Sequence, residues 1–367
     1  MKKELFICTT PFQIISSISM CMSFGNNSDI IIDPQSRNSD KYVSNIRKLS
    51  IFNNVFNAKE IEVLNKIRNS NRTKRKIMIT LSYLFLNSII KKMFPHGFDY
   101  DTVYLSNNTF ISNQIVQYVN LHKIDVEFVY YDDGEGSYDN NIVNRESSSD
   151  RFIKTVLRRS VVPAKSSKLL YSPELYNMIH PDTTETIGRV PYFNASDKIQ
   201  SVIEQVFETD SIKTIEEPFI ILDTMPYEVM VKEEADKYQE QIQKICDALN
   251  GKVCVKKHPR DKKMNRYGCK EYTDNSVPFE MLCLCSDFSS KTLIVLSSTS
   301  ILTPKIIFNQ EPHIVLLYKL FPMKSGFDDQ RTKMYDSIKE IYADPSKISI
   351  PESFEELNEL ISSFSKM

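Results

Sequence analysis

Several features are scarce in this sequence, and each scarcity excludes a class of protein. Glycine occurs only 8 times and no G-x-x-x-x-G-K segment is present, so the chain has no Walker-type phosphate loop. Neither sign of charge dominates, because 46 Lys and Arg residues face 47 Asp and Glu residues. Such a chain does not attract a phosphate backbone by bulk electrostatics, and we expect no nucleic acid as partner. No apolar run reaches the length of about 18 residues that a membrane-spanning helix needs.

The cysteines do not suggest a metal site. There are seven, an odd number, and most lie in apolar runs, where a small buried thiol is the usual state. Cys283 and Cys285 form C-x-C, and no His or second cysteine pair stands at zinc spacing around them. We therefore expect no metal, and a reducing compartment fits best.

The N-terminal segment combines a basic start with apolar residues and could be mistaken for a secretion signal. Glu4, Pro11 and Gln13 interrupt it, and no small-residue cleavage site follows. A strand, a turn and an amphipathic helix explain the pattern better, so we expect a cytoplasmic protein.

A second apolar segment, residues 77–90, has basic residues at 72–76 before it and Lys91 and Lys92 after it. The pattern is typical of a core helix with solvated ends, which is the interpretation that we adopt. The alternative is a helix that lies on an anionic leaflet, in peripheral contact with the inner face of the plasma membrane.

Length and composition predict two globular domains. The 367 residues are about twice what one core organises, and 41% hydrophobic with 25% charged residues is ordinary for a globular protein. Short apolar runs alternate with segments of helical period, which is the pattern of parallel strands joined by helices. The expected strands are residues 5–10, 29–33, 102–106, 126–131, 218–223, 252–257, 292–297 and 313–318. The expected helices are residues 11–23, 58–68, 110–122, 232–249, 299–309 and 352–364.

These elements predict an α/β protein of two doubly wound, Rossmann-like domains. We place the N-terminal domain at residues 1–190, a linker at 191–216 and the C-terminal domain at 217–367. The linker assignment depends on several prolines and an acidic stretch, although residues 197–207 have a helical pattern. Open parallel sheets bind ligands at the carboxyl ends of their strands, so residues that could carry chemistry are sought there.

Two adjacent carboxylates follow the strand at 126–131. Asp132 and Asp133 precede Gly134, which places both acids at the sheet edge. Asp-Gly is a common turn signal, so a structural turn is one interpretation. The other is a general base, in which one carboxylate takes the proton of a substrate hydroxyl. A magnesium site is disfavoured, because adjacent carboxylates point in different directions and no third ligand is evident.

A basic segment ends the strand at 252–257. Lys257 and His258 are followed by Pro259, which restricts the backbone of His258 to an extended conformation. An imidazole held in this way among basic residues suits an anion, such as a phosphate leaving group. A structural histidine in a solvated basic loop is the alternative.

Hydroxyl-bearing residues follow two further strands. Ser297, Ser298 and Thr299 precede a predicted helix. One interpretation is that they cap this helix, which needs only one hydroxyl. Because there are more hydroxyls than one cap needs, the other interpretation is an anion site formed with the amides of the helix N-terminus. Thr10 and Gln13 follow the first strand as an ordinary helix start, and contact with substrate from there is a secondary hypothesis.

The order of these motifs along the chain is more specific than any one of them. The segments are ICTTPFQ near the start, YDDGEGS before the midpoint, KKHPR in the second half and LSSTS about forty residues later. This order resembles the bacterial sialyltransferases of glycosyltransferase family 52 and, more loosely, the related capsule polysialyltransferase families. The resemblance spans residues 5 to about 310. It implies the GT-B fold, in which two Rossmann-like domains face each other across a cleft.

The resemblance also implies the reaction. Sialic acid passes from CMP-sialic acid, the donor substrate, to a terminal sugar hydroxyl of lipooligosaccharide or capsule, with inversion and without a metal or other cofactor. Asp132 is then the general base, and Asp133 and Gly134 shape the turn on the acceptor side, together with Thr10 and Gln13. His258 stabilises or protonates the departing CMP phosphate. The remaining donor-side residues are Pro259, Lys257, Ser297, Ser298 and Thr299.

Two other functions fit the same residues. A GT-B glycosyltransferase with another nucleotide sugar, such as a galactosyl or glucosyl donor, needs its diphosphate neutralised. A two-domain protein that only binds an anion forms no product, and Asp132 is then dispensable. A nucleotide-sugar donor and a glycan acceptor are the expected partners. A homodimer is left open, as are the acceptor glycan and the linkage.

Overall fold

The structure is a computed structural model that describes residues 2–25, 27–33, 39–106, 109–138, 155, 160, 162–192, 196–258, 261, 267–323 and 329–365. The chain divides into two compact units. The first unit comprises Met1–Pro173 and Thr183–Glu208, and the second comprises Glu174–Asp182 and Thr209–Met367. Each unit contains one parallel sheet with helices on its faces and is described by itself.

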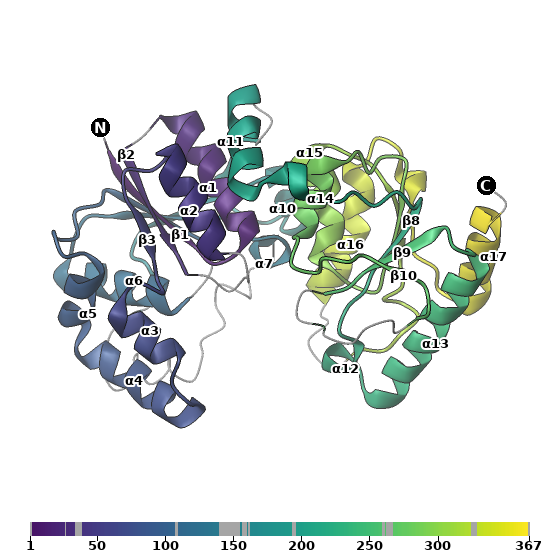
Figure 1. Ribbon diagram of the computed structural model, residues 1–367, viewed down its shortest axis with the longest axis horizontal. Coiled ribbons are helices and arrows are strands. Elements are labelled where there is room, and N and C mark those ends of the chain that lie inside the picture. The colour runs from purple at the N-terminus through teal and green to yellow at the C-terminus, as the bar shows by residue number, and fades with distance from the viewer. Residues whose placement is uncertain are drawn as a thin grey trace. The chain divides into compact units, whose positions relative to one another are not determined.

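The sheet of the first unit has seven parallel strands in the order β3-β2-β1-β4-β5-β6-β7 (Figure 1). The strands are β1 (Lys3–Cys8), β2 (Asn27–Ile32), β3 (Val55–Asn57), β4 (Thr102–Leu105), β5 (Glu127–Tyr131), β6 (Ser166–Leu170) and β7 (Ile187–Arg189). Five of the six residues of β1 are buried. This burial follows from the parallel arrangement, because the helices that connect parallel strands cover both faces of the sheet.

The described helices of the first unit are α1 (Pro11–Phe24), α2 (Ser39–Leu49), α3 (Glu62–Arg68), α4 (Arg72–Leu84), α5 (Leu86–Met93), α6 (Phe110–His122), α7 (Glu135–Tyr138) and α11 (Asp197–Phe207). Helix α10 (Pro173–Ile179) belongs, after its first residue, to the second unit. Helices α1, α2 and α11 lie on one face of the sheet, and α5 and α6 lie on the other (Figure 1). Leu5 and Ile7 of β1 belong to the core formed with α5 and α6. Cys8 points to the opposite face, where its Sγ lies 3.0 Å from the Ser17 hydroxyl of α1.

Helix α1 begins beside the carboxyl end of β1 because its first turn is capped on both sides. The Thr10 hydroxyl accepts a hydrogen bond from the amide of Gln13, and the Gln13 side chain accepts one from the amide of Thr10. Pro11 occupies the first helical position, where its missing amide hydrogen costs nothing. This capping box fixes the Gln13 side chain at the sheet edge.

The sheet of the second unit has six parallel strands in the order β10-β9-β8-β11-β12-β13. The strands are β8 (Phe219–Leu222), β9 (Val253–Lys256), β10 (Lys270–Glu271), β11 (Thr292–Val295), β12 (His313–Leu316) and β13 (Ile348–Ser349). The helices are α12 (Pro226–Val229), α13 (Lys232–Ala248), α14 (Phe279–Cys285), α15 (Leu302–Phe308), α16 (Asp329–Ile341) and α17 (Phe354–Ser365). Helices α13 and α17 supply the core on one face, where Ile242 and Ile361 pack with Ile221.

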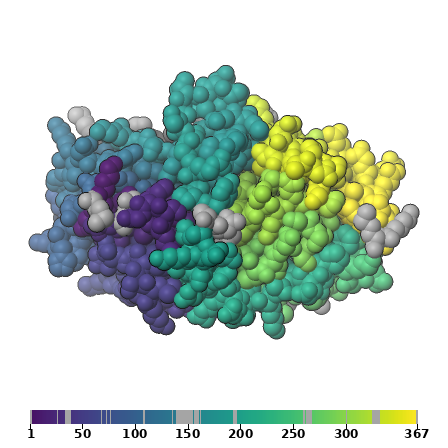
Figure 2. All heavy atoms as spheres, turned by 90° about the horizontal axis from the view of Figure 1, so that it is seen from above, coloured from purple at the N-terminus to yellow at the C-terminus, as the bar shows by residue number. Residues whose placement is uncertain are grey.

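The segment predicted as a linker contains a helix that packs on the first unit. Helix α11 lies beside α1 and α2 in the ribbon and in the space-filling view (Figure 1, Figure 2). The rings of Phe207 and Tyr42 are 4.6 Å apart, and the Asn45 amide donates to the carbonyl of Val206 at 3.1 Å. The helical pattern at 197–207 is therefore confirmed, and this helix is part of a domain surface.

Residues 77–90 form parts of two helices that meet at Phe85. The expected core helix is found for α5, whose Leu86, Ile89 and Ile90 are buried. The expectation is wrong for the outer face of α4, because Ile77 and Leu81 there are exposed. None of the described helices has the length and apolar character needed to cross a membrane.

Replacing Phe207 by Ala should destabilise the first unit by about 3 kcal/mol, because it removes a buried ring between α11 and α2. Urea unfolding followed by circular dichroism measures the change. Lys198→Ala, an exposed position on the same helix, is the control and should unfold as the wild type does. Equal unfolding of the two variants would show that α11 does not contribute to this core.

Candidate active site

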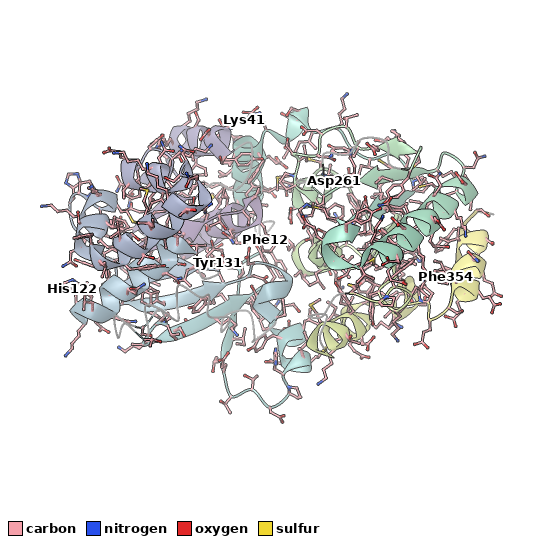
Figure 3. The ribbon with its side chains drawn as sticks, turned by 90° about the horizontal axis from the view of Figure 1, so that it is seen from below. Phe12, Lys41, His122, Tyr131, Asp261 and Phe354 are labelled. Carbon is pink, nitrogen blue, oxygen red and sulfur yellow. The ribbon has the colours of Figure 1, made fainter. Side chains whose placement is uncertain are left out.

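The carboxyl edge of the first sheet gathers the predicted acceptor-side residues. Strands β1, β4 and β5 are neighbours and parallel, so the residues that follow each strand emerge at the same edge. Phe12 in the first turn of α1 and Tyr131 at the end of β5 mark this edge in Figure 3. The structure therefore brings the Thr-Thr-Pro segment and the Asp-Asp-Gly turn together.

Asp132 is completely buried and accepts three hydrogen bonds. Its Oδ2 accepts from the Tyr138 hydroxyl at 2.8 Å and from the amide of Tyr171 at 3.0 Å, and its Oδ1 accepts from the amide of Gly134 at 2.8 Å. Burial raises the pKa of the carboxyl to about 6, and the nearby charge of Asp133 adds to the rise. The three donors act in the opposite direction, because they stabilise the ionised form.

Asp133 is half-buried and lies in the turn that Gly134 makes. Gly134 has a φ of 84°, a left-handed conformation that a side chain would strain. The amide of Asp133 donates to the Ser137 hydroxyl at 2.7 Å, which holds the turn against α7. The two acids thus differ, because one carboxylate is enclosed and the other is partly accessible.

Gln13 links the first motif to the second. Its Nε2 donates to Oδ1 of Asp133 at 2.6 Å, and its Oε1 accepts from the amide and the hydroxyl of Thr9. Gln13 is itself completely buried. Gln13, predicted as part of a helix start and secondarily as an acceptor-side residue, therefore positions the partly accessible carboxylate.

Sequence reasoning missed Tyr138 and Tyr171, the two residues that complete the Asp132 environment. Both are fully buried, and the Tyr138 hydroxyl also accepts from the amide of Ser172 at 3.1 Å. The weak signal for Tyr138 was its place six residues after Asp132. Tyr171 follows β6, a strand whose sequence, SSKLL, is not an apolar run and was not predicted.

The carboxyl edge of the second sheet gathers the predicted donor-side residues. Strand β8 pairs with β9 on one side and with β11 on the other, and Leu222 is in register with both Lys256 and Val295. His258 and Ser297 therefore follow strands that flank β8. Asp223, which sequence reasoning did not single out, follows β8 between them and accepts from the Tyr267 hydroxyl at 3.0 Å.

His258 is half-buried at this edge. Its carbonyl accepts a hydrogen bond at 2.9 Å from the amide of Asp261, a residue labelled in Figure 3. Pro259, which carried the argument for a restricted His258 backbone, lies outside the described residues.

The two lysines before His258 are buried. The Lys257 ammonium group forms an ion pair with Glu271 at 2.7 Å, and both side chains are almost completely enclosed. Burial lowers the pKa of Lys256 to about 8, because the charged ammonium loses its hydration. Lys256 lies 5.4 Å from the centre of the Tyr272 ring. The positive charge of Lys257 is thus already balanced within the unit.

The serine-rich segment begins directly after β11. The hydroxyl of Ser297 lies 2.9 Å from that of Tyr335 in α16, and the Ser298 hydroxyl accepts from the amide of Ser300 at 3.2 Å. Thr299 begins a short 3-10 turn that leads into α15, while its side chain lies outside the described part of the structure. Among the described residues, no group of three or more His, Cys, Asp or Glu is placed to hold a metal ion.

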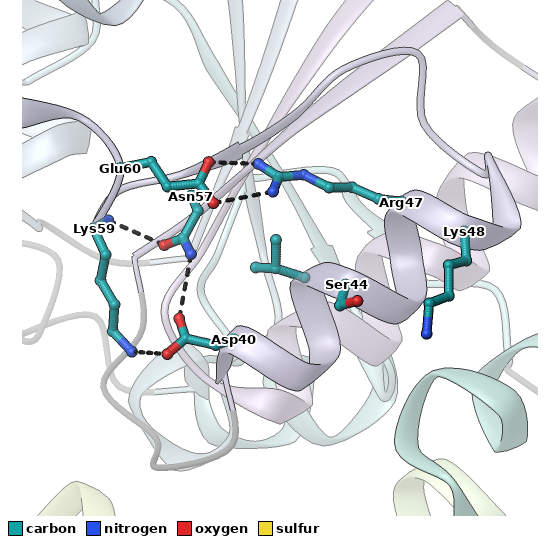
Figure 4. Close-up of a pocket in the computed structure, with 8 residues that line it drawn as sticks. Asp40, Ser44, Arg47, Lys48, Asn57, Lys59 and Glu60 are labelled. Carbon is teal, nitrogen blue, oxygen red and sulfur yellow. Dashed lines mark hydrogen bonds and ion pairs between the residues drawn. The ribbon is translucent and has the colours of Figure 1, made fainter.

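A cavity of about 520 Å³ lies at the end of β3, away from the motif residues (Figure 4). Arg47 pairs with Glu60, and Lys59 pairs with Asp40 at 2.7 Å. Asn57 donates to Asp40 at 3.3 Å. The charged residues that line this cavity therefore pair with one another, and their pairs connect α2 to the end of β3 and the segment after it.

Comparison with solved structures identifies the fold. The glycosyltransferase SnogD from Streptomyces nogalater aligns with 100% of this chain and 92% of its own, with a TM-score of 0.51 and 8% identity. UGT89C1 of Arabidopsis thaliana, solved with UDP-L-rhamnose, aligns with 99% of this chain and 90% of its own, with a TM-score of 0.53 and 9% identity. The chain has the GT-B fold of these glycosyltransferases, with two Rossmann-like α/β domains, which confirms the predicted fold class.

A match to a family model assigns the chain to a family as well as to a fold. The model for the alpha-2,8-polysialyltransferase (POLYST) family matches residues 4–317, and the chain belongs to this family. The match includes all four motifs, and the protein is a glycosyltransferase of the sialyltransferase class. A nucleotide-sugar donor and a glycan acceptor follow from that class. Membership of family 52 stays a prediction, and a search of curated proteins finds no match.

Lys257→Met should lower the free energy of unfolding by about 3 kcal/mol, because it leaves the Glu271 charge enclosed without its partner. Adding Glu271→Leu should restore most of the loss. We expect the double variant to bind CMP like the wild type, as measured by calorimetry. A stable double variant that no longer binds CMP would instead place Lys257 in the donor site.

Proposed function

We propose that this protein transfers sialic acid from CMP-sialic acid to a sugar hydroxyl of a bacterial surface glycan, with inversion and without a metal ion. The observation that carries the proposal is the distribution of the motifs in a chain of this family. The acid pair lies at the carboxyl edge of one Rossmann-like sheet. The histidine and the serines lie at the carboxyl edge of the other.

The proposed general base is Asp132. A base works best when its pKa is close to the working pH, and burial brings this carboxyl to about 6. A carboxylate offers about four acceptor positions, and three are occupied by Tyr138, Tyr171 and Gly134. The fourth position, on Oδ1, is left for the acceptor hydroxyl. Because Asp132 is fully buried, the acceptor hydroxyl reaches it only after the residues that cover it rearrange.

The proposed leaving-group partner is His258, helped by the hydroxyls of Ser297 and Ser298. Departure of CMP from the anomeric carbon builds charge on a single phosphate. An imidazolium and hydroxyl donors can stabilise that charge, whereas a diphosphate leaving group would call for a metal ion or further cations. A single displacement by the activated hydroxyl inverts the anomeric carbon.

The proposed acceptor is a glycan of capsule or lipooligosaccharide. The family match supports a glycan that already ends in sialic acid, and the resemblance to family 52 supports one that ends in galactose. Because the two acceptors differ in charge and linkage, they are compared directly in the assay below.

The decisive experiment measures CMP release from CMP-sialic acid in excess EDTA. Oligosialic acid and a galactose-terminated oligosaccharide are tested as acceptors, with an acceptor-free control. We expect release that depends on one acceptor and survives EDTA. Binding of UDP rather than CMP by calorimetry would move the assignment to another nucleotide sugar, as in the galactosyl or glucosyl alternative. Binding of CMP without release with either acceptor would favour a non-catalytic anion binder.

On the acid side of its pH profile, the kcat/KM of the wild type should rise with pH, with an apparent pKa of about 6. The base must be ionised to accept a proton, so activity is lost as pH falls through the raised pKa of Asp132. The CMP-release assay between pH 4.5 and pH 8 measures the profile. A profile that stays flat down to pH 5 would mean that a carboxylate of ordinary pKa is the base.

Asp132→Asn should lower kcat by about 100-fold or more, whereas CMP binding to the other unit should be unchanged. Asp133→Asn is the matched comparison, because it changes the neighbouring carboxylate that Gln13 holds. Thermal unfolding reports whether each variant keeps its fold. Full activity of Asp132→Asn would overturn the assignment, and a folded, inactive Asp133→Asn beside it would transfer the role to Asp133.

A further inference from the structure

Helix α4 and the residue that follows it, Phe85, expose a stripe of large apolar side chains. Ile77, Leu81, Leu84 and Phe85 are 55%, 44%, 49% and 61% exposed. Their spacing of three and four residues places them on one side of the helix. Such a contiguous apolar surface on a soluble unit marks an interaction site more often than isolated exposed residues do.

The inner face of the same helix is fixed to the core. The rings of Tyr83 and Phe110 of α6 are 6.1 Å apart, and Tyr83 is buried. The Ser82 hydroxyl accepts from Gln114 of α6 at 3.1 Å. With Tyr83 and Ser82 held in this way, the helix cannot turn its apolar stripe inward without losing both contacts.

The chain around the stripe is strongly basic. Residues 63–98 contain eight Lys and Arg residues and no Asp or Glu, although the whole chain has a net charge of -1. Lys74 and Arg75 of α4 and Lys91 and Lys92 of α5 are exposed. In the part of the chain that the structure describes, none of these four forms an ion pair with a carboxylate, and Glu62, the acid that precedes this stretch, pairs with Lys66.

We propose that this basic and apolar surface of α4 and α5 docks on an anionic lipid bilayer. By helical spacing Lys74 lies on the same side of α4 as Ile77 and Leu81. An interfacial helix needs both an apolar face that enters the acyl boundary and cations that meet anionic headgroups. A soluble polyanionic glycan satisfies the cations alone and leaves the apolar stripe in water.

The first test uses the absence of tryptophan from the chain. Phe85→Trp introduces a single fluorophore in the stripe, and Phe24→Trp introduces one at an exposed position of α1. On vesicles containing phosphatidylglycerol, we expect a blue shift for Phe85→Trp and quenching by brominated acyl chains, with neither effect for Phe24→Trp. Absence of quenching at Phe85→Trp would overturn insertion of the stripe.

The second test separates the apolar and electrostatic parts by vesicle flotation. Leu81→Ser/Leu84→Ser and Lys74→Glu/Arg75→Glu should each weaken binding to phosphatidylglycerol vesicles by about tenfold or more. The controls Phe24→Ser/Val231→Ser and Lys232→Glu/Lys244→Glu change the same types of residue elsewhere and should bind like the wild type. Vesicles of phosphatidylcholine alone should retain much less of the wild type.

Two outcomes would overturn the proposal. One is a wild type that does not float with anionic vesicles. The other is a stripe variant that binds the vesicles as tightly as the wild type. In that case, loss of vesicle binding by the wild type when oligosialic acid is added would identify the surface as a polyanion site. CMP release with a soluble acceptor is measured on every variant and should stay unchanged, so a failure of docking is distinguished from a failure of the proposed reaction.

Discussion

The hydrogen bonds to the Asp132 carboxylate join the turn that contains it to the start of the segment after β6, which is about forty residues away in the sequence. They fix the Asp-Asp-Gly turn, the short helix α7 and the residue that follows β6. Burial raises the pKa of this carboxyl, and each of the three donors lowers it by stabilising the ionised form. The position of Asp133, and with it the contact to Gln13, depends on this turn.

The two units contribute opposite kinds of chemistry. The first presents carboxylates whose charge is controlled by burial, while the second presents an imidazole, hydroxyls and lysines. Within the second unit, Lys257 is neutralised by Glu271, whereas His258 and the serine-rich segment lie at the carboxyl edge of the sheet. This division suits a displacement reaction, in which the nucleophile needs a base and the leaving group needs a donor.

Much of the fold could be predicted from the sequence, because buried parallel strands such as β1, β5, β9 and β11 each contain an apolar run. The strands β6, β10 and β13 could not, since they are short, partly polar and defined by their neighbours. Tyr171 was missed with β6, whereas Asp223 ends a predicted strand and was missed because its partner, Tyr267, comes from another segment. The exposure of the apolar face of α4 was missed for a different reason. Sequence periodicity shows that a helix has an apolar stripe, and only packing shows whether that stripe is covered.

The placement of β6, β7 and α11 has a consequence for how the first unit forms during synthesis. Chains emerge from the ribosome in order, and domains close as their last elements arrive. The amide of Tyr171 that binds Asp132 emerges well after the acid pair, and α11, which ends at Phe207, emerges later still. Until β6 pairs with β5, the Asp132 carboxylate lacks one of its three donors. The first unit cannot complete its packing before the start of the second has been translated.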